Sequence, residues 1–190
     1  MPGAPPEGEP VPAGGTLPES ARAGLGMRPF GIYVHVPFCA TRCGYCDFNT
    51  YTAAELGGGP AASLATYPAL AIAEIGFARK VLGDVDVGVS TVFFGGGTPT
   101  LLVPAAFGAI LDAIGAEFGL AAGAEVTTEA NPESVTEAIL GELRARGITR
   151  LSFGMQSAVS EVLTVLDRTH RPGRPEQCVR WAKQAGRRLA

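Results

Sequence analysis

The chain has 190 residues, a formal net charge of −3, and 26 glycines and 15 prolines, which together make up about a fifth of the sequence. These two residue types are unevenly spread, because residues 1–29 contain 6 of the glycines and 7 of the prolines. The composition excludes a collagen, a coiled coil and a fully disordered chain. We therefore expect a disordered leader over residues 1–29, followed by one globular domain over residues 30–190.

Acidic and basic residues are separated along the sequence. Residues 142–190 contain 10 of the 15 Lys and Arg residues but only 4 acidic residues, so the negative charge is concentrated in residues 1–141. The net charge argues against a general nucleic-acid binder. We interpret the basic stretch as the solvated faces of helices, in preference to a phosphate- or RNA-binding surface.

One uncharged stretch, residues 87–111, is long enough to raise the question of a membrane span. It contains Gly95–Gly97, Pro99 and Pro104, which would interrupt a spanning helix, so we predict no transmembrane segment. The leader has acidic residues and lacks an apolar region, which argues against a secretory signal. We expect a cytoplasmic protein whose four cysteines are reduced thiols or metal ligands.

After the leader, apolar runs alternate with Ala-rich stretches, which is typical of a parallel sheet with helices outside it. The expected strands span residues 31–36, 89–94, 125–130 and 149–154. The expected helices span residues 63–82, 104–118, 134–146, 158–166 and 174–185. Four strands cannot close a barrel, and the last helix predicts a further strand. We therefore expect a doubly wound or barrel-type α/β fold, and we interpret the chain as the N-terminal part of a longer protein.

Residue types at the helix ends support these boundaries. Ser63 and Pro104 suit the first positions of the first two helices. Ser134, with Glu137 three residues later, matches a capping box at the start of the third helix, and Gly147 suits its end.

The strongest functional signal is a group of three cysteines, Cys39, Cys43 and Cys46, directly after the first expected strand. Soft thiolates at such spacing can converge on one metal centre. A [4Fe–4S] cluster with three cysteine ligands keeps one iron open for a ligand that is not part of the protein. Tyr45 and Phe48 in the same loop would give such a cluster apolar shielding.

Three alternatives compete with this interpretation. Zinc could be held by the three thiolates and His35, but His35 lies within a strand, where its side chain faces one side of a sheet. A disulfide is disfavoured in the cytosol, and structural buried thiols do not need such clustering. The fourth cysteine, Cys178, is interpreted as a small core residue.

The CxxxCxxC spacing, with an aromatic residue before the third cysteine, resembles the signature of the radical S-adenosylmethionine (SAM) superfamily. The residues from Tyr33 to Phe48 resemble the group of coproporphyrinogen dehydrogenases and HemW heme chaperones within it. This resemblance extends from about Gly31 to the end of the chain. It implies a partial (β/α)6 TIM-like barrel with about four βα units present. It also implies a [4Fe–4S] cluster on the three cysteines, with SAM at the open iron and one-electron reduction cleaving it.

The same resemblance implies SAM contacts at the ends of the other strands, the face where parallel α/β folds place their sites. Glycines let a backbone approach a ligand closely, and the Gly95–Thr100 segment lacks the lysine and spacing of a P-loop. A buried carboxylate at Glu129 is costly unless it accepts hydrogen bonds, which agrees with a contact to SAM. The alternative is that Glu129 lies at a strand end exposed to solvent. For Arg168, the alternative to a SAM contact is an exposed charge on the surface of a helix. The implied contacts are Tyr33, Tyr45, Gly96, Gly97, Thr98, Glu129, Gln156 and Arg168.

The residue two positions after the third cysteine separates two branches of the group. Coproporphyrinogen dehydrogenases have a fourth cysteine there, and this chain has Phe48. The difference favours a HemW-like chaperone, which by resemblance binds heme and delivers it to respiratory proteins. The alternatives are oxidative decarboxylation of coproporphyrinogen III and a zinc-stabilised binding module. His170 is given no role.

Overall fold

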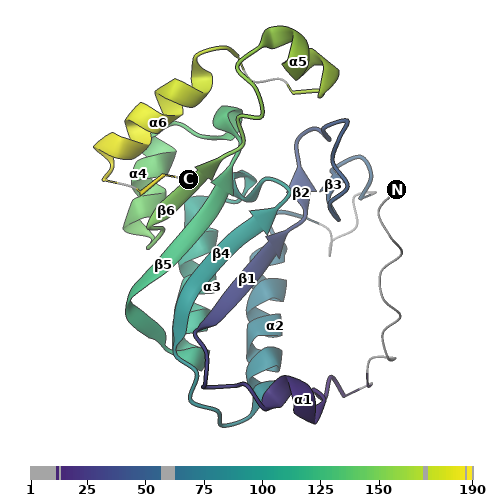
Figure 1. Cartoon of the computed structure of the whole chain (residues 1–190), viewed down its shortest axis with the longest axis vertical. Helices are drawn as coiled ribbons and strands as arrows, with labels where there is room; N and C mark the ends of the chain where they lie inside the picture. Colours follow the sequence, from purple (N-terminus) through teal and green to yellow (C-terminus); the bar gives the residue numbers. More distant parts are fainter. Residues whose placement is uncertain (1–11, 13, 57–62, 169–170, 187, 190) are drawn as a thin grey trace.

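The computed structural model describes residues 12, 14–56, 63–168, 171–186 and 188–189. Within this part of the chain, the central sheet is parallel and has the order β1-β4-β5-β6-β7 (Figure 1). Its strands are β1 (Phe30–Val36), β4 (Val89–Gly96), β5 (Leu120–Ala130), β6 (Arg150–Phe153) and β7 (Arg188–Leu189). The short strands β2 (Phe38–Cys39) and β3 (Tyr51–Thr52) form a separate parallel pair.

The described helices alternate with these strands as expected for βα units, apart from a one-turn helix that precedes β1. They are α1 (Glu19–Arg22), α2 (Tyr67–Leu82), α3 (Pro104–Phe118), α4 (Glu137–Ala145), α5 (Ser160–Val165) and α6 (Arg174–Gln184). In Figure 1, α2, α3 and α4 lie behind the sheet. The core fills the space between them and the sheet, where Phe94 of β4 packs on Phe107 of α3 with ring centroids 4.9 Å apart.

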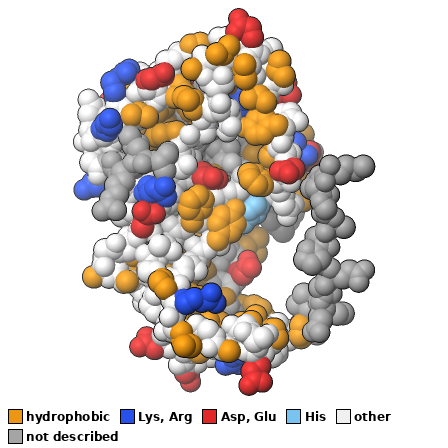
Figure 2. Space-filling model, in the orientation of Figure 1, with side chains coloured by type: hydrophobic (Ala, Val, Ile, Leu, Met, Phe, Trp, Pro, Cys, Tyr) orange, Lys and Arg blue, Asp and Glu red, His pale blue; other side chains and the backbone are white. Residues whose placement is uncertain are grey.

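The other face of the sheet, turned toward the viewer in Figure 1, is not covered by α2, α3 or α4. Side chains on successive strand residues point to opposite faces, so β1 buries Val34 and Val36 against the helices and turns Tyr33 to the uncovered face. Figure 2 shows hydrophobic side chains mixed with single charged ones over this uncovered face. The alternation explains how a sheet with one apolar face can carry polar site residues on the other.

The predicted fold class is confirmed. The chain is a parallel α/β fold of the TIM-like barrel type, and α3 has the boundaries that the sequence predicts. The sequence prediction counts four strands within the chain, whereas the sheet has a fifth, β7, which follows the last helix and pairs with β6. Cys178 is fully buried in the core, as predicted.

The starts of two helices differ from the sequence prediction. Ser134 does not cap α4, because it belongs to a 3-10 turn (Pro132–Ser134) and the hydroxyl of Thr136 accepts the hydrogen bond from the N–H of Ile139. The first long helix begins at Tyr67, and Ser63 instead accepts a hydrogen bond from the N–H of Thr66 in the preceding turn. The described part of the segment before residue 30 includes the one-turn helix α1.

Among the described residues, no helix combines the length and the apolar character that crossing a bilayer requires. The uncharged stretch 87–111 is divided between β4, a 3-10 turn at Pro99–Leu101 and the first half of α3. Strand β4 therefore ends at Gly95 and Gly96, and a turn begins at Pro99. These residues interrupt the uncharged stretch where the sequence predicts.

Candidate functional site

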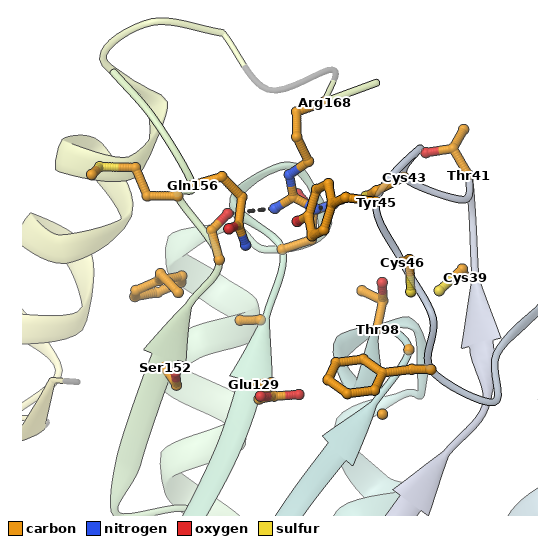
Figure 3. A pocket seen from close by; sticks show the side chains of 18 of the residues that line it. Cys39, Thr41, Cys43, Tyr45, Cys46, Thr98, Glu129, Ser152, Gln156 and Arg168 are labelled. Atoms are coloured by element: carbon orange, nitrogen blue, oxygen red, sulfur yellow. Dashed lines mark hydrogen bonds between the residues drawn. The ribbon is translucent and has the colours of Figure 1, made fainter. Parts of the chain in front are cut away.

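A cavity of about 530 Å³ opens at the carboxyl ends of the strands, beside the loop that carries the three cysteines. The loops after β1, β4, β5 and β6 all contribute to its wall, and so does the segment after α5. All the predicted site residues line it except Tyr33. The predicted residues in the wall are Cys39, Cys43, Tyr45, Cys46, Gly96, Gly97, Thr98, Glu129, Gln156 and Arg168 (Figure 3).

The cysteine loop is closed at its base by the β2–β3 pair, which aligns Cys39 with Thr52. Arg42 links two parts of the loop, because its guanidinium donates to the carbonyl of Thr50 and lies 3.3 Å from Glu55. The other oxygen of Glu55 accepts hydrogen bonds from the N–H and the hydroxyl of Thr52, at 2.7 and 2.9 Å. These contacts join the start of the cysteine loop to its end.

The three loop cysteines are free thiols that remain partly exposed. Cys39 and Cys46 lie next to each other in Figure 3, while Cys43 lies beside Tyr45 and Arg168. Burial raises the pKa of the Cys39 thiol, and side-chain hydrogen bonds with Thr50 and Thr98 oppose this rise.

The placement of the thiols bears on the choice between a cluster and zinc. No group of three or more His, Cys, Asp or Glu side chains, within the described ranges, is arranged around a single-ion position. A zinc site needs such convergence, whereas each thiolate of an iron–sulfur cluster binds a different iron. The two kinds of site therefore differ in whether the thiolates meet at one ion or bind separate irons.

His35 is occupied by other contacts. One of its ring nitrogens, Nδ1, lies 3.0 Å from the hydroxyl of Tyr33, and the other, Nε2, lies 2.8 Å from the carbonyl of Asn49. His35 is therefore a structural link between β1 and the end of the cysteine loop, and both nitrogens are engaged away from a metal. Tyr33 does not line the cavity, and its ring stacks on Phe93 with centroids 6.1 Å apart.

The glycine segment after β4 is pressed against the start of the cysteine loop. The N–H of Gly97 donates to the carbonyl of Val36 at 2.8 Å, and the N–H of Thr98 donates to the carbonyl of Phe38 at 2.7 Å. A Cβ at position 97 would lie 2.5 Å from the carbonyl oxygen of Phe38 and 2.9 Å from the sulfur of Cys39. Only glycine fits there, so the backbone itself forms this part of the wall.

Glu129 lies on the uncovered face of β5, at the floor of the cavity. Burial raises the pKa of its carboxyl group, and a hydrogen bond from the backbone N–H of Gly96 partly opposes this rise. Ser152 of β6 is its partner in the strand register and lies on the same face. A half-buried carboxylate with one backbone donor has the capacity to accept further hydrogen bonds from a ligand.

Arg168 closes the cavity from above, as Figure 3 shows. The chain turns at Asp167, whose φ of 52° is left-handed, and this turn directs Arg168 back toward the strands. Its guanidinium donates to the sulfur of Cys43 at 3.3 Å and also to the carbonyl of Gly154. The remaining nitrogen, Nε, is buried and has no hydrogen-bond partner in the described part of the chain.

Gln156 is placed by an unusual backbone conformation. Its φ of 62° lies in the left-handed region, which non-glycine residues rarely adopt. Such strain is often found where the surrounding structure fixes a functional side chain. The strain at Gln156 coincides with its position in the wall of the cavity.

Several residues of the wall are absent from the sequence prediction. Among them are Thr41, Asp47, Asn131, Ser152 and Met155. Ser152 had a usable signal, because it lies near the carboxyl end of the fourth expected strand, where parallel α/β folds place their sites. The prediction that gave no role to His170 falls outside the described residues.

The donor set matches what an iron–sulfur cluster and a zwitterionic ligand would need. Three free thiols are available for iron, a glycine backbone approaches them closely, and a carboxylate and a guanidinium lie on opposite sides of the cavity. The unpartnered Nε of Arg168 is a donor that a bound anionic group would satisfy. The residues present therefore fit both groups.

Comparison with known proteins gives a consistent family. Residues 33–189 match the family model described as the radical SAM superfamily. The HemW heme chaperone of Mycobacterium tuberculosis (strain H37Rv) is 50% identical over 147 residues, which cover 77% of this chain and 36% of that protein. The HemW heme chaperone of Escherichia coli (strain K12) is 33% identical over 170 residues, which cover 85% of this chain and 41% of that protein.

A solved structure agrees with these matches. Coproporphyrinogen III oxidase (HemN) from Escherichia coli, described as a radical SAM enzyme, superimposes with a TM-score of 0.74 at 28% sequence identity. The alignment covers 87% of this chain and 36% of that one. The chain thus spans less than half the length of each of these three relatives.

Proposed function

Because the chain belongs to the radical SAM superfamily, we propose that it binds a [4Fe–4S] cluster through Cys39, Cys43 and Cys46 and binds SAM in the adjoining cavity. We further propose that it acts as a HemW-like heme chaperone. One observation carries the cofactor part of this proposal. Segments far apart in the sequence bring three free thiols, a glycine backbone, a half-buried carboxylate and a guanidinium to the wall of one cavity.

Each group in the wall suits a particular part of the two cofactors. The three thiolates would hold iron and keep one iron open, and a reduced cluster supplies one electron to SAM when both are bound. Glu129 would accept hydrogen bonds from the amino group of SAM, and Arg168 would donate to its carboxylate. The backbone at Gly96–Thr98 would allow close approach, while Tyr45 and Gln156 would bound the site on its outer side.

The chaperone part of the proposal is supported by similarity and by the cysteine pattern. The HemW heme chaperones named above match about three quarters or more of this chain. Phe48 stands at the position two after Cys46, where the dehydrogenase branch is expected to have a fourth cysteine. Heme would be a cargo, respiratory proteins its recipients, and the cytoplasm the compartment that keeps the thiols reduced.

Anaerobic reconstitution tests the cofactor proposal. We expect about four iron and four sulfide per chain, and SAM binding to the loaded protein by equilibrium dialysis. Cys43→Ala should lose most of the iron, whereas Cys178→Ala, the matched control in the core, should retain it. Stoichiometric zinc in place of iron and sulfide would overturn the proposal.

Heme delivery needs a separate test. Hemin added to the loaded chain should give a shifted and saturable Soret absorption, and the bound heme should pass to a heme-free respiratory protein. Because the chain spans less than half of the HemW relatives, the deciding result comes from a full-length version, where the absence of both heme binding and heme transfer would remove the chaperone part while leaving the cofactor part intact.

The second candidate is oxidative decarboxylation of coproporphyrinogen III, which the structural similarity to HemN favours. Conversion of coproporphyrinogen III by the loaded chain, with SAM and a reductant, would support it. Such conversion would displace the chaperone proposal, since the two assign different fates to a tetrapyrrole.

A further inference from the structure

Thr50 lies behind the three cysteines, outside the residues that line the cavity. It follows Cys46 by four positions and is 1% exposed, which makes it one of the few fully buried polar residues in the described chain. A buried hydroxyl is costly unless it forms a hydrogen bond. Its contacts therefore indicate what it does.

The hydroxyl of Thr50 is placed between two of the three cysteines. Its Oγ1 lies 3.8 Å from the sulfur of Cys46, and it also forms a side-chain hydrogen bond with Cys39. The other acceptor within reach is the carbonyl of Phe48, at 3.5 Å, which is at the limit of hydrogen-bond distance. Thr50 thus faces two sulfurs with a single proton to donate.

The backbone of Thr50 is fixed independently of these sulfurs. Its N–H donates to the carbonyl of Phe48 at 2.8 Å, and its carbonyl accepts from Arg42. Arg42 is itself paired with Glu55 at 3.3 Å. The backbone that carries the hydroxyl is therefore held by hydrogen bonds within the loop.

Iron binding would fix the direction of the hydrogen bond. A cysteine that ligates iron is a thiolate and has no proton, so between Thr50 and these sulfurs only the hydroxyl can donate. A charged sulfur is also a stronger acceptor than the carbonyl of Phe48. We propose that Thr50 is a positioning residue that donates to the sulfurs of Cys39 and Cys46 and raises the reduction potential of the cluster they hold.

The physical reason is electrostatic. Reduction adds negative charge to the cluster and its sulfurs, and a hydroxyl dipole directed at those sulfurs stabilises the added charge. Hydrogen bonds to the sulfurs are among the factors that set iron–sulfur reduction potentials. This inference rests on the proposed cluster, and it assigns Thr50 a role beyond the three ligands.

The test compares Thr50→Val, which removes the hydroxyl at nearly constant shape, with Thr50→Ser, which keeps it. Thr127→Val is the matched control, because Thr127 is also 1% exposed but its hydroxyl donates to Glu125 at 3.2 Å on the central strand. Each whole chain is reconstituted anaerobically and assayed for iron and sulfide. The midpoint potential is then measured by potentiometry followed by electron paramagnetic resonance.

We expect equal iron and sulfide in all four proteins, and a more negative midpoint potential in Thr50→Val alone. Thr50→Ser should restore the potential of the unmodified chain, which a merely structural role for the methyl group would not do. An unchanged potential in a loaded Thr50→Val chain would overturn the inference. A folded Thr50→Val chain that takes up no iron would also overturn it, because the hydroxyl would then be needed to form the site. If the unmodified chain takes up no cluster, the proposed function falls and this inference falls with it.

Discussion

The charged side chain of Glu129 lowers the stability of the fold and also has a proposed role in binding SAM. It lies half-buried on the uncovered face of the sheet, and the N–H of Gly96 donates to it from the neighbouring strand. Burial disfavours the charged form, so the pKa of the carboxyl group is raised in the folded chain. Residues that serve a ligand are often kept at such a cost to stability.

Glu129→Gln should therefore raise the melting temperature of the ligand-free chain at neutral pH. The folded state holds the proton more tightly than the unfolded chain, so the free energy of unfolding falls as the pH rises from the ordinary carboxyl value of 4.5 through the raised pKa. The difference between variant and unmodified chain should vanish near about pH 4, where the carboxyl is protonated in both states. Thermal unfolding across this pH range checks the prediction.

Glu125→Gln is the matched control on the same strand. Glu125 pairs with Arg150 at 3.3 Å, so its loss should lower the melting temperature slightly or leave it unchanged. The glutamine at position 129 should also weaken SAM binding to the loaded chain. Equal melting temperatures of Glu129→Gln and the unmodified chain at neutral pH would contradict the prediction that the buried carboxylate lowers the stability of the fold.

Gly97→Ala tests the close approach of the glycine segment to the cysteine loop. The new methyl group would meet the Phe38 carbonyl at 2.5 Å and the Cys39 sulfur at 2.9 Å, and the first of these is backbone that cannot rotate away. We expect a loss of about 1–3 kcal/mol in the free energy of unfolding and reduced iron uptake. Urea denaturation and iron analysis measure the two effects.

Gly115→Ala provides the comparison within α3. Nothing lies within 4 Å of a Cβ at this position, so the change should stabilise the helix by about 0.5–1 kcal/mol and leave iron uptake unaltered. Equal stability and equal iron uptake of the two alanine variants would show that neither property depends on the close approach of Gly97 to the cysteine loop.

At the scale of elements, two residues near the start of α4, Ser134 and Thr136, are candidates for its N-terminal cap. The hydroxyl of Thr136 accepts from the N–H of Ile139 at 3.2 Å, whereas the hydroxyl of Ser134 contacts Thr100 and the carbonyl of Asn131. Thr136→Ala should cost about 1 kcal/mol and speed hydrogen exchange at the Ile139 amide. Ser134→Ala should leave that amide protected, and the opposite pattern would restore Ser134 as the cap.

The same region shows why element boundaries were only partly predictable. The boundaries of α3 follow from local signals, a proline at its first residue and Gly119 with a φ of 72° after its last. Ser134 and Thr136 are both suitable caps, and what separates them is a contact between Ser134 and Thr100, 34 residues away. A pattern within one segment cannot report such a tertiary contact.

The candidate site shows the same division. The cysteine spacing and the strand ends indicate most of the wall, because parallel strands bring their carboxyl ends to one edge. Ser152 enters the site through its register with Glu129, and Thr50 through the shape of the loop. Tyr33, which the resemblance implies as a SAM contact, is not among the residues that line the cavity, but it lies on the same face of the sheet as Glu129, and burial together with the charge of Glu129 raises the pKa of its hydroxyl.

At the scale of the whole molecule, the cysteine loop is joined to a segment more than a hundred residues away. The N–H of Gly44 donates to the carbonyl of Leu166 at 3.3 Å, and Arg168 donates to the sulfur of Cys43 at 3.3 Å. The approach is close, since a Cβ at Gly44 would lie 2.5 Å from a carboxylate oxygen of Asp167. A ligand that makes one of these segments more rigid should therefore also make the other more rigid.

Cluster loading should slow hydrogen exchange in both segments together. Because residues 39–50 and 154–168 share these contacts, protection is expected in both, while α3, on the far side of the sheet, should exchange as before. Arg168→Gln removes the side-chain link but keeps the backbone bond from Gly44, so protection of 154–168 should weaken while that of 39–50 persists. A chain with Ala in place of Cys39, Cys43 and Cys46 should show no change on reconstitution. Protection confined to residues 39–50 in the unmodified chain would show that the two segments respond independently, and that the cavity is built from parts that a bound cluster does not couple.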